Sequence, residues 1–332
     1  MLDIALGPDI SRRAVIGGLV AAAVLPRLGM AQTPEQASET LRISTWSRVR
    51  SLHPLTVTSP SEFAVSDMLY SGLCRLDSSS LPQPDLASGW SASEDARQYT
   101  FQLREGVKFH DGTPFTSADV IATFEAAMKP ETGSPARVRI EHIERMEAPD
   151  DLTVVFYLSS ADADFPIQMG DGNLRIIPKA SAENGDALNT TANGTGPFKL
   201  TEFDSARIIK TVRNDEYYDT SVPYLASVEV VLFPDSTAEV ATFLSGQTDV
   251  MMNVQQPDFG RVKATPGVEA LNVPSSRFVC LTMRQDQKPF DDLRVRKAMS
   301  MAVDRKALID LVLEGLGRPA ADTNVGMDLK YA

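Results

Sequence analysis

The stretch "LREGVKFHDGTPFTSADV", residues 103–120, carries the most informative local pattern of this 332-residue chain. Apolar and polar residues alternate up to Phe109, as they do in a strand that is buried on one side. Asp111-Gly112 is a preferred hairpin-turn pair, because glycine accepts positive φ angles. Thr116 or Ser117 then provides a helix N-cap. The stretch therefore predicts a hairpin that runs directly into a helix.

His110 and Asp111 in this stretch also raise the question of a metal-binding or catalytic site. The other two histidines, His53 and His142, do not stand at metal-ligand spacing from His110. We therefore interpret His110 as a turn residue, and we expect no metal site, no cofactor and no catalytic residue in this chain.

Composition limits the classes of function. The chain is 43% hydrophobic and 23% charged, which is ordinary for a globular protein, and its formal net charge is −12. This acidic balance argues against nucleic acid or an anionic membrane as the main partner. Strands and helices intermix without an internal repeat, a pattern that favours an α/β fold with more than one lobe.

The N-terminus has the layout of an export signal. Arg12 and Arg13 precede an apolar run over residues 14–25, and the small residues Gly29 and Ala31 mark a cleavage site after about Ala31. The paired arginines resemble a twin-arginine signal. As a helix, the apolar run spans only about 18 Å, against a hydrocarbon core of about 30 Å. We therefore expect an exported, periplasmic protein, with residues 1–31 as its signal peptide.

Hydrophobic periodicity and turn residues place further elements along the chain. We predict strands at 41–46 and 278–283, a connecting loop at 81–95, and helices at 61–73, 292–303 and 305–313.

Motifs for enzyme chemistry are not visible. "NGTGPF", residues 193–198, lacks the Gly-Lys-Ser/Thr ending of a phosphate loop, and no Gly-x-Ser-x-Gly elbow is present. Cys74 and Cys280 stand among apolar neighbours. They are either two buried free thiols or the two halves of one long-range disulfide.

Several stretches together resemble the family 5 solute-binding proteins of ABC importers, the group that includes dipeptide-, oligopeptide- and nickel-binding proteins. They are "LYSGLCRLD", "PDLASGWSASEDARQYTFQLREGVKFHDGTPFTSADV", "GTGPFKL", "NDEYYDTSVPYLASVEV", "FLSGQTDV" and "PFDDLRVRKAMSMAVDRKALIDLVLEGLG". The resemblance covers nearly all of residues 41–317, and it assigns "FHDGTPFTSADV" to the family's hairpin-to-helix signature.

The resemblance implies a two-lobed α/β fold of the periplasmic-binding-protein type (class II), with an extra subdomain inserted in the first lobe. Family members run on well past Ala332, so the second lobe is expected to be incomplete here. The implied boundaries are residues 41–75 and 178–274 for lobe I, 76–177 for the inserted subdomain, and 275–332 for the start of lobe II.

The resemblance also implies a ligand-binding site between the lobes and no enzymatic activity. The expected contacts are Thr45, Trp46 and Ser47 at the exit of the first strand, and Arg277 and Phe278 on a segment that crosses between the lobes. Trp46 offers an apolar wall with an N–H donor, and the alternative is that it belongs to the core.

The expected function is the solute-binding component of an ABC importer. It would act as a monomer that captures a small, peptide-like ligand and delivers it to an inner-membrane permease. Many peptide binders of this family carry Asn where Met283 stands, so opines, sugars and metal chelates remain open as ligands. The alternatives to an importer component are an exported hydrolase with a noncanonical site and a ligand-sensing partner of a membrane receptor.

The twin-arginine interpretation has a direct test. Changing Arg12 and Arg13 together to Lys is expected to leave the precursor in the cytoplasm, because twin-arginine export depends on recognition of that pair. Immunoblotting of periplasmic and cytoplasmic fractions measures the outcome. Mature protein in the periplasm at normal yield would assign the segment to general secretion instead.

Overall fold

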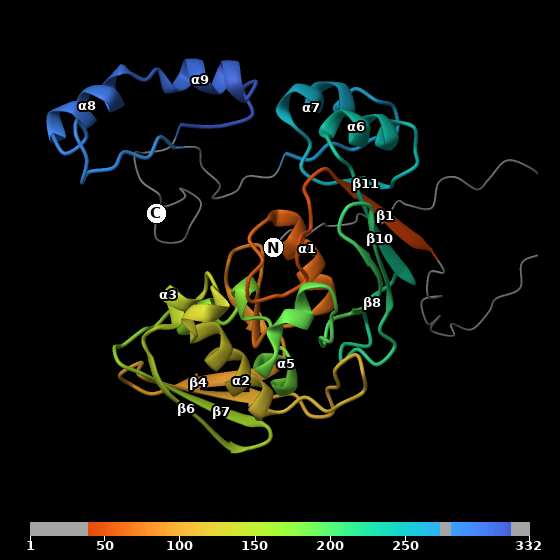
Figure 1. The fold of residues 1–332 in the computed structure, drawn as a ribbon, viewed down its shortest axis with the longest axis vertical. Helices are drawn as coiled ribbons and strands as arrows, with labels where there is room; N and C mark the ends of the chain where they lie inside the picture. The colour runs from red at the N-terminus through yellow and green to blue at the C-terminus, as the bar shows by residue number, and fades with distance from the viewer. Residues whose placement is uncertain (1–38, 273–279, 320–332) are drawn as a thin grey trace, which may run out of the picture. The chain divides into compact units, whose positions relative to one another are not determined.

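The computed structural model describes residues 39–272 and 280–319 of the chain (Figure 1). Its strands are β1 (Thr40–Thr45), β2 (Cys74–Leu76), β3 (Pro82–Pro84), β4 (Ala87–Ala92), β5 (Gln98–Leu103), β6 (Ile143–Asp150), β7 (Thr153–Leu158), β8 (Phe198–Asp204), β9 (Ile208–Arg213), β10 (Ser227–Leu232) and β11 (Val250–Met251). Its α-helices are α1 (Pro60–Leu69), α2 (Ser117–Met128), α3 (Arg137–Ile140), α4 (Phe165–Gln168), α5 (Lys179–Glu183), α6 (Ser236–Leu244), α7 (Gln256–Lys263), α8 (Leu293–Ala302) and α9 (Arg305–Val312). Short 3-10 turns occupy Pro130–Thr132, Gly172–Leu174 and Gly185–Asn189.

The predicted hairpin and helix are confirmed. Lys108 and Pro114 form an antiparallel bridge, and Gly112 turns between them with φ +88°. α2 follows at once from its N-cap Thr116, whose backbone N–H donates to the Asp119 carboxylate at 2.9 Å. This contact satisfies a backbone donor that would otherwise lack a partner at the start of the helix.

An antiparallel sheet of order β4-β5-β7-β6 holds an aromatic core, and α2 contacts its β6 and β7 strands. Phe156 lies at the centre of this core. Its ring meets Phe124 of α2 at 5.0 Å, Phe165 at 5.4 Å and Phe101 of β5 at 5.6 Å between centroids. All four rings are buried. Edge-to-face packing of this kind adds to the free energy gained by removing the rings from water.

A five-stranded sheet has the order β11-β1-β10-β9-β8, and β1 pairs in parallel with β11, with Ile43 opposite Val250. Two compact units can be distinguished in the chain. One contains Ser47–Val230, and the other contains Arg42–Trp46 together with the described residues from Val231 onward. The lobe and subdomain boundaries that the resemblance implies stay a prediction.

Three expectations about local structure are wrong. The segment 81–95 is not a loop, because β3 pairs with β2 and β4 pairs with β5. The described part of the strand expected at 278–283, residues 280–283, is irregular, and residues 278 and 279 lie outside the described residues. Cys280 is therefore exposed and not buried, whereas Cys74 is buried, and both are free thiols.

The helices expected at 292–303 and 305–313 are confirmed as α8 and α9. The helix expected at 61–73 forms as α1 but ends at Leu69, because the backbone is extended at Tyr70. No side chain of α8 or α9 is buried, and Met301 and Leu311 are exposed. Among the residues that the structure describes, no helix is long and apolar enough to cross a membrane.

Candidate ligand-binding site

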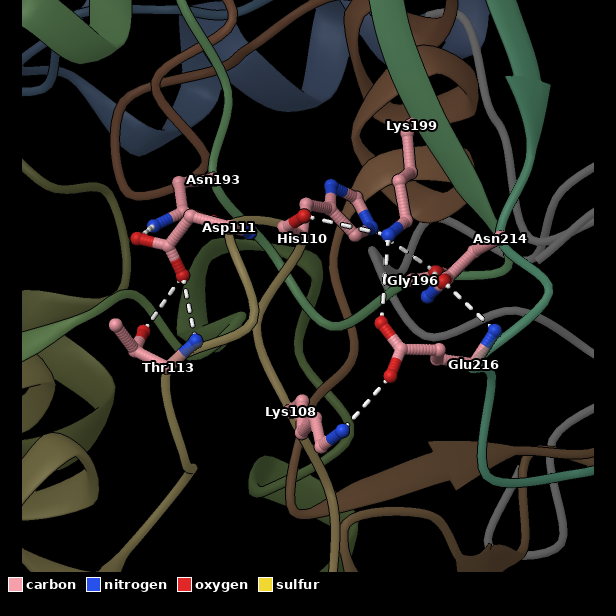
Figure 2. A network of polar contacts seen from close by, with 9 residues as sticks. All are labelled: Lys108, His110, Asp111, Thr113, Asn193, Gly196, Lys199, Asn214 and Glu216. Atoms are coloured by element: carbon pink, nitrogen blue, oxygen red, sulfur yellow. Dashed lines mark hydrogen bonds and ion pairs between the residues drawn. The ribbon is translucent and has the colours of Figure 1, made fainter.

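The residues that most resemble catalytic machinery lie where the hairpin meets the loop before β8 (Figure 2). Asp111 accepts hydrogen bonds from the Thr113 hydroxyl at 2.6 Å and from Asn193 Nδ2 at 2.7 Å. Lys108 forms an ion pair with Glu216 at 2.7 Å, and Lys199 lies 3.9 Å from the same carboxylate. The carboxylates are thus engaged in joining three segments of chain.

His110 is held in one tautomer by this junction. Its Nε2 lies 3.0 Å from the Gly196 carbonyl oxygen, and because a carbonyl only accepts, Nε2 carries the proton. The Nδ1 atom is buried without a partner. Burial lowers the pKa of His110 to about 4, because a proton added at Nδ1 would find no acceptor. His110 is therefore a neutral structural residue, in agreement with its interpretation from the sequence.

Gly196 explains why the loop "NGTGPF" needs glycine. Its N–H donates to the Leu69 carbonyl at 3.0 Å and so caps the C-terminal end of α1. A Cβ at position 196 would lie 2.5 Å from the Leu69 carbonyl carbon and 2.6 Å from the Met68 oxygen. The backbone of the loop thus touches the backbone of the helix, and there is no room for a side chain.

The exit of β1 presents the residues expected to bind ligand. Thr45 is fully buried, and its carbonyl accepts from the Phe233 N–H at 2.9 Å. Trp46 is 38% exposed, so its ring is not part of a closed core. Ser47 follows with intermediate exposure. Arg277 and Phe278 lie outside the described residues, and the binding role of all five stays a prediction.

Glu239 is a residue near this exit that the sequence patterns do not single out. It lies in the first turn of α6, where an acidic residue is common because it interacts favourably with the helix dipole, so the sequence predicts an ordinary surface residue there. Its side chain is nevertheless fully buried, and burial raises its pKa to about 7. Only the packing of α6 reveals this residue.

A cavity of about 420 Å³ lies elsewhere, within the unit that contains Ser47–Val230. Its charged groups pair with each other: Arg175 with Asp67 at 2.6 Å, and Arg139 with Asp171 at 2.6 Å. These pairs stabilise the walls of the cavity and leave its charge balanced.

The structure combines an α/β fold with a partly exposed aromatic residue at the exit of a strand. The family described as bacterial extracellular solute-binding proteins, family 5 (middle region), matches residues 82–332. The chain belongs to this family, as its sequence motifs indicated.

Known relatives bind different solutes. The chain is 28% identical over 293 residues to heme-binding protein A of Haemophilus influenzae, covering 80% of this chain and 53% of that protein. It is 28% identical over 304 residues to the glutathione-binding protein GsiB of Escherichia coli, covering 91% and 59%. The chain thus spans little more than half the length of the curated relatives it matches.

Solved structures give the same fold. The binding protein AgaA of A. tumefaciens R10, in complex with agropinic acid, matches with a TM-score of 0.75 and 29% identity over 85% of this chain and 57% of that one. NikZ of Campylobacter jejuni, in complex with Ni(L-His), matches with a TM-score of 0.74 and 25% identity, over 83% of this chain and 55% of that one. The fold is therefore that of periplasmic binding proteins, as expected.

Replacing Gly196 by Ala is expected to lower the free energy of unfolding by about 2 kcal/mol or more, because the added methyl overlaps the α1 backbone. Gly89→Ala is the matched control, since a Cβ there meets no atom within 4 Å. Urea denaturation followed by circular dichroism measures both variants. Equal stability of the two variants would contradict the close-contact explanation.

The low pKa of His110 predicts a specific loss of stability in acid. The unfolded chain takes up a proton at His110 below pH 6.5, whereas the folded protein does so only near pH 4. The contribution of neutral His110 to the free energy of unfolding is therefore full above pH 6.5 and is lost as the pH falls to about 4. The loss amounts to about 3 kcal/mol. His110→Gln is expected to reduce the slope of unfolding free energy against pH in this window. An unchanged slope in His110→Gln would contradict the assignment.

Proposed function

We propose that this protein is the solute-binding component of a bacterial ABC importer, which captures a small solute and delivers it to an inner-membrane permease. Membership of the family 5 extracellular solute-binding proteins, over residues 82–332, is the observation that carries the proposal. The protein acts after export, in the periplasm, as a monomer without a cofactor, and it performs no catalysis.

The solute is held at the exit of β1. Thr45 and Ser47 offer hydroxyl groups, and the exposed ring of Trp46 offers a wall on which an apolar or planar group packs. Arg277 and Phe278 complete the site in this proposal. An apolar surface with a few polar groups is the usual composition of a small-molecule site.

A peptide-like solute is the first choice among ligands. The ABC transporter-associated periplasmic binding protein DppA of Helicobacter pylori, solved in complex with the peptide STSA, shares the fold with a TM-score of 0.72 and 25% identity, and GsiB is a glutathione-binding protein. AgaA and NikZ hold an opine and a nickel complex, so these solutes are the competing outcomes.

Native mass spectrometry of the full-length protein, purified from the periplasm without refolding, is expected to show a bound small peptide. Trp46→Ala is expected to weaken binding of the identified solute about tenfold or more, because the variant removes a large contact surface. Trp90→Phe is the matched control, since Trp90 packs against Phe101 in the four-stranded sheet. Isothermal titration calorimetry measures both affinities.

Other outcomes would replace the proposal. Turnover of a substrate without a stable complex, together with covalent labelling of one Ser, Cys or Asp, would identify an exported hydrolase. Capture of a membrane sensor in place of a permease, by cross-linking in intact cells, would identify a ligand-sensing partner. A bound opine or metal chelate would keep the importer and change its solute.

A further inference from the structure

Glu239 of α6 has a surrounding that an ionised carboxylate does not tolerate. The residue is 0% exposed, and neither of its carboxylate oxygens has a hydrogen-bond partner. A buried charge without a partner is strongly unfavourable, so such a group takes up a proton or finds a donor. The neutral form is therefore the one that this packing accommodates.

Two polar groups of β1 and its exit act on the Glu239 carboxyl. They are the Ser44 hydroxyl and the backbone N–H of Trp46, and both favour the charged form, although burial outweighs them. The Ser44 Oγ already donates a hydrogen bond to the Val250 carbonyl at 3.3 Å. An ionised Glu239 would thus compete with Val250 for the single hydroxyl proton of Ser44.

A protonated Glu239 removes this competition. Its carbonyl oxygen can accept from the Trp46 N–H, its own O–H can donate to Ser44 Oγ, and Ser44 can keep its bond to Val250. Every donor in this chain then has one acceptor. Loss of the proton leaves two acceptor oxygens and only one uncommitted donor.

Charged groups on the neighbouring elements do not supply a counter-charge for Glu239. α6 contacts β11 and α7, and the Glu239 carboxyl also interacts with Ser44 of β1. The N-cap Asp235 accepts from the Ala238 N–H, Asp249 accepts from the Arg42 backbone N–H, and Asp258 pairs with Arg261. The exposed charged side chains on these elements, or directly before them, are Glu39, Arg42, Asp235, Asp249, Arg261 and Lys263. The protonation of Glu239 is therefore set by its burial and by the two groups of β1 and its exit.

We propose that Glu239 is a positioning residue of the candidate ligand-binding site, whose neutral carboxyl fits the exit of β1 and whose ionisation draws the Ser44 hydroxyl away from Val250 and shifts the Trp46 backbone and ring. The consequence for solute affinity rests on the function proposed above. The coupling between Glu239 and Trp46 does not, because it concerns the protein without solute.

Tryptophan fluorescence of the solute-free, full-length protein tests this coupling. The chain has two tryptophans, so Trp90→Phe leaves Trp46 as its reporter. Between pH 5 and 9, the emission of Trp46 is expected to change in one transition with a midpoint near 7. In Glu239→Gln, which keeps the side-chain shape and cannot ionise, this transition is expected to vanish. Glu105→Gln, a change at an exposed glutamate, is expected to retain it.

A second measurement uses the unchanged protein. With ¹³C-labelled glutamate, the carboxyl resonance that disappears in Glu239→Asp is expected to titrate near pH 7, well above the ordinary range of a glutamate side chain. A Glu239 resonance that titrates near 4.5, or a Trp46 transition that persists in Glu239→Gln, would overturn the inference. Failure to bind any solute would count against the proposed function alone, since no solute enters either experiment.

Discussion

The contact between the Gly196 backbone and the last turn of α1 is the constraint on which the surrounding structure depends. The Gly196 N–H caps the Leu69 carbonyl, while its own carbonyl accepts from His110 Nε2 and from Asn214 Nδ2 at 3.1 Å. One residue thus joins a helix, a hairpin and the end of β9. Such a junction requires a residue without a side chain and a histidine that stays neutral.

The polar residues of this junction serve the structure, whereas those at the exit of β1 are available for binding. His110, Asp111, Lys199 and Glu216 have the residue types of an active site, yet each one is engaged in holding backbone segments together. The β1 exit is different, because Trp46 there is partly exposed and the buried carboxyl of Glu239, which acts on the Trp46 backbone N–H, has no hydrogen-bond partner of good geometry. Exposed aromatic surface and polar groups without hydrogen-bond partners mark the places where binding and regulation are expected.

Several features could be predicted from sequence because they are decided by neighbours along the chain. The turn at Asp111-Gly112 and the cap at Thr116 depend on residues within a few positions of each other. The serines and glycine of segment 81–95 disfavour a strand locally, so its composition predicts a loop, but the pairing of β4 with β5 outweighs that preference. The strand expected at 278–283 is a different case, since residues 280–283 pair with no strand in the described part of the chain although their composition favours one.

The sequence by itself determined the hairpin, the helix cap, the absence of familiar catalytic motifs and membership of the solute-binding family, because these depend on local chemistry and on the order of motifs. Only the tertiary structure decided that Gly196 packs against α1 and that Trp46 remains partly exposed. It alone decided that Glu239 is buried and unpaired. Burial depends on elements far apart in the chain, since α6 meets a strand nearly 200 residues before it, and no local pattern records that meeting.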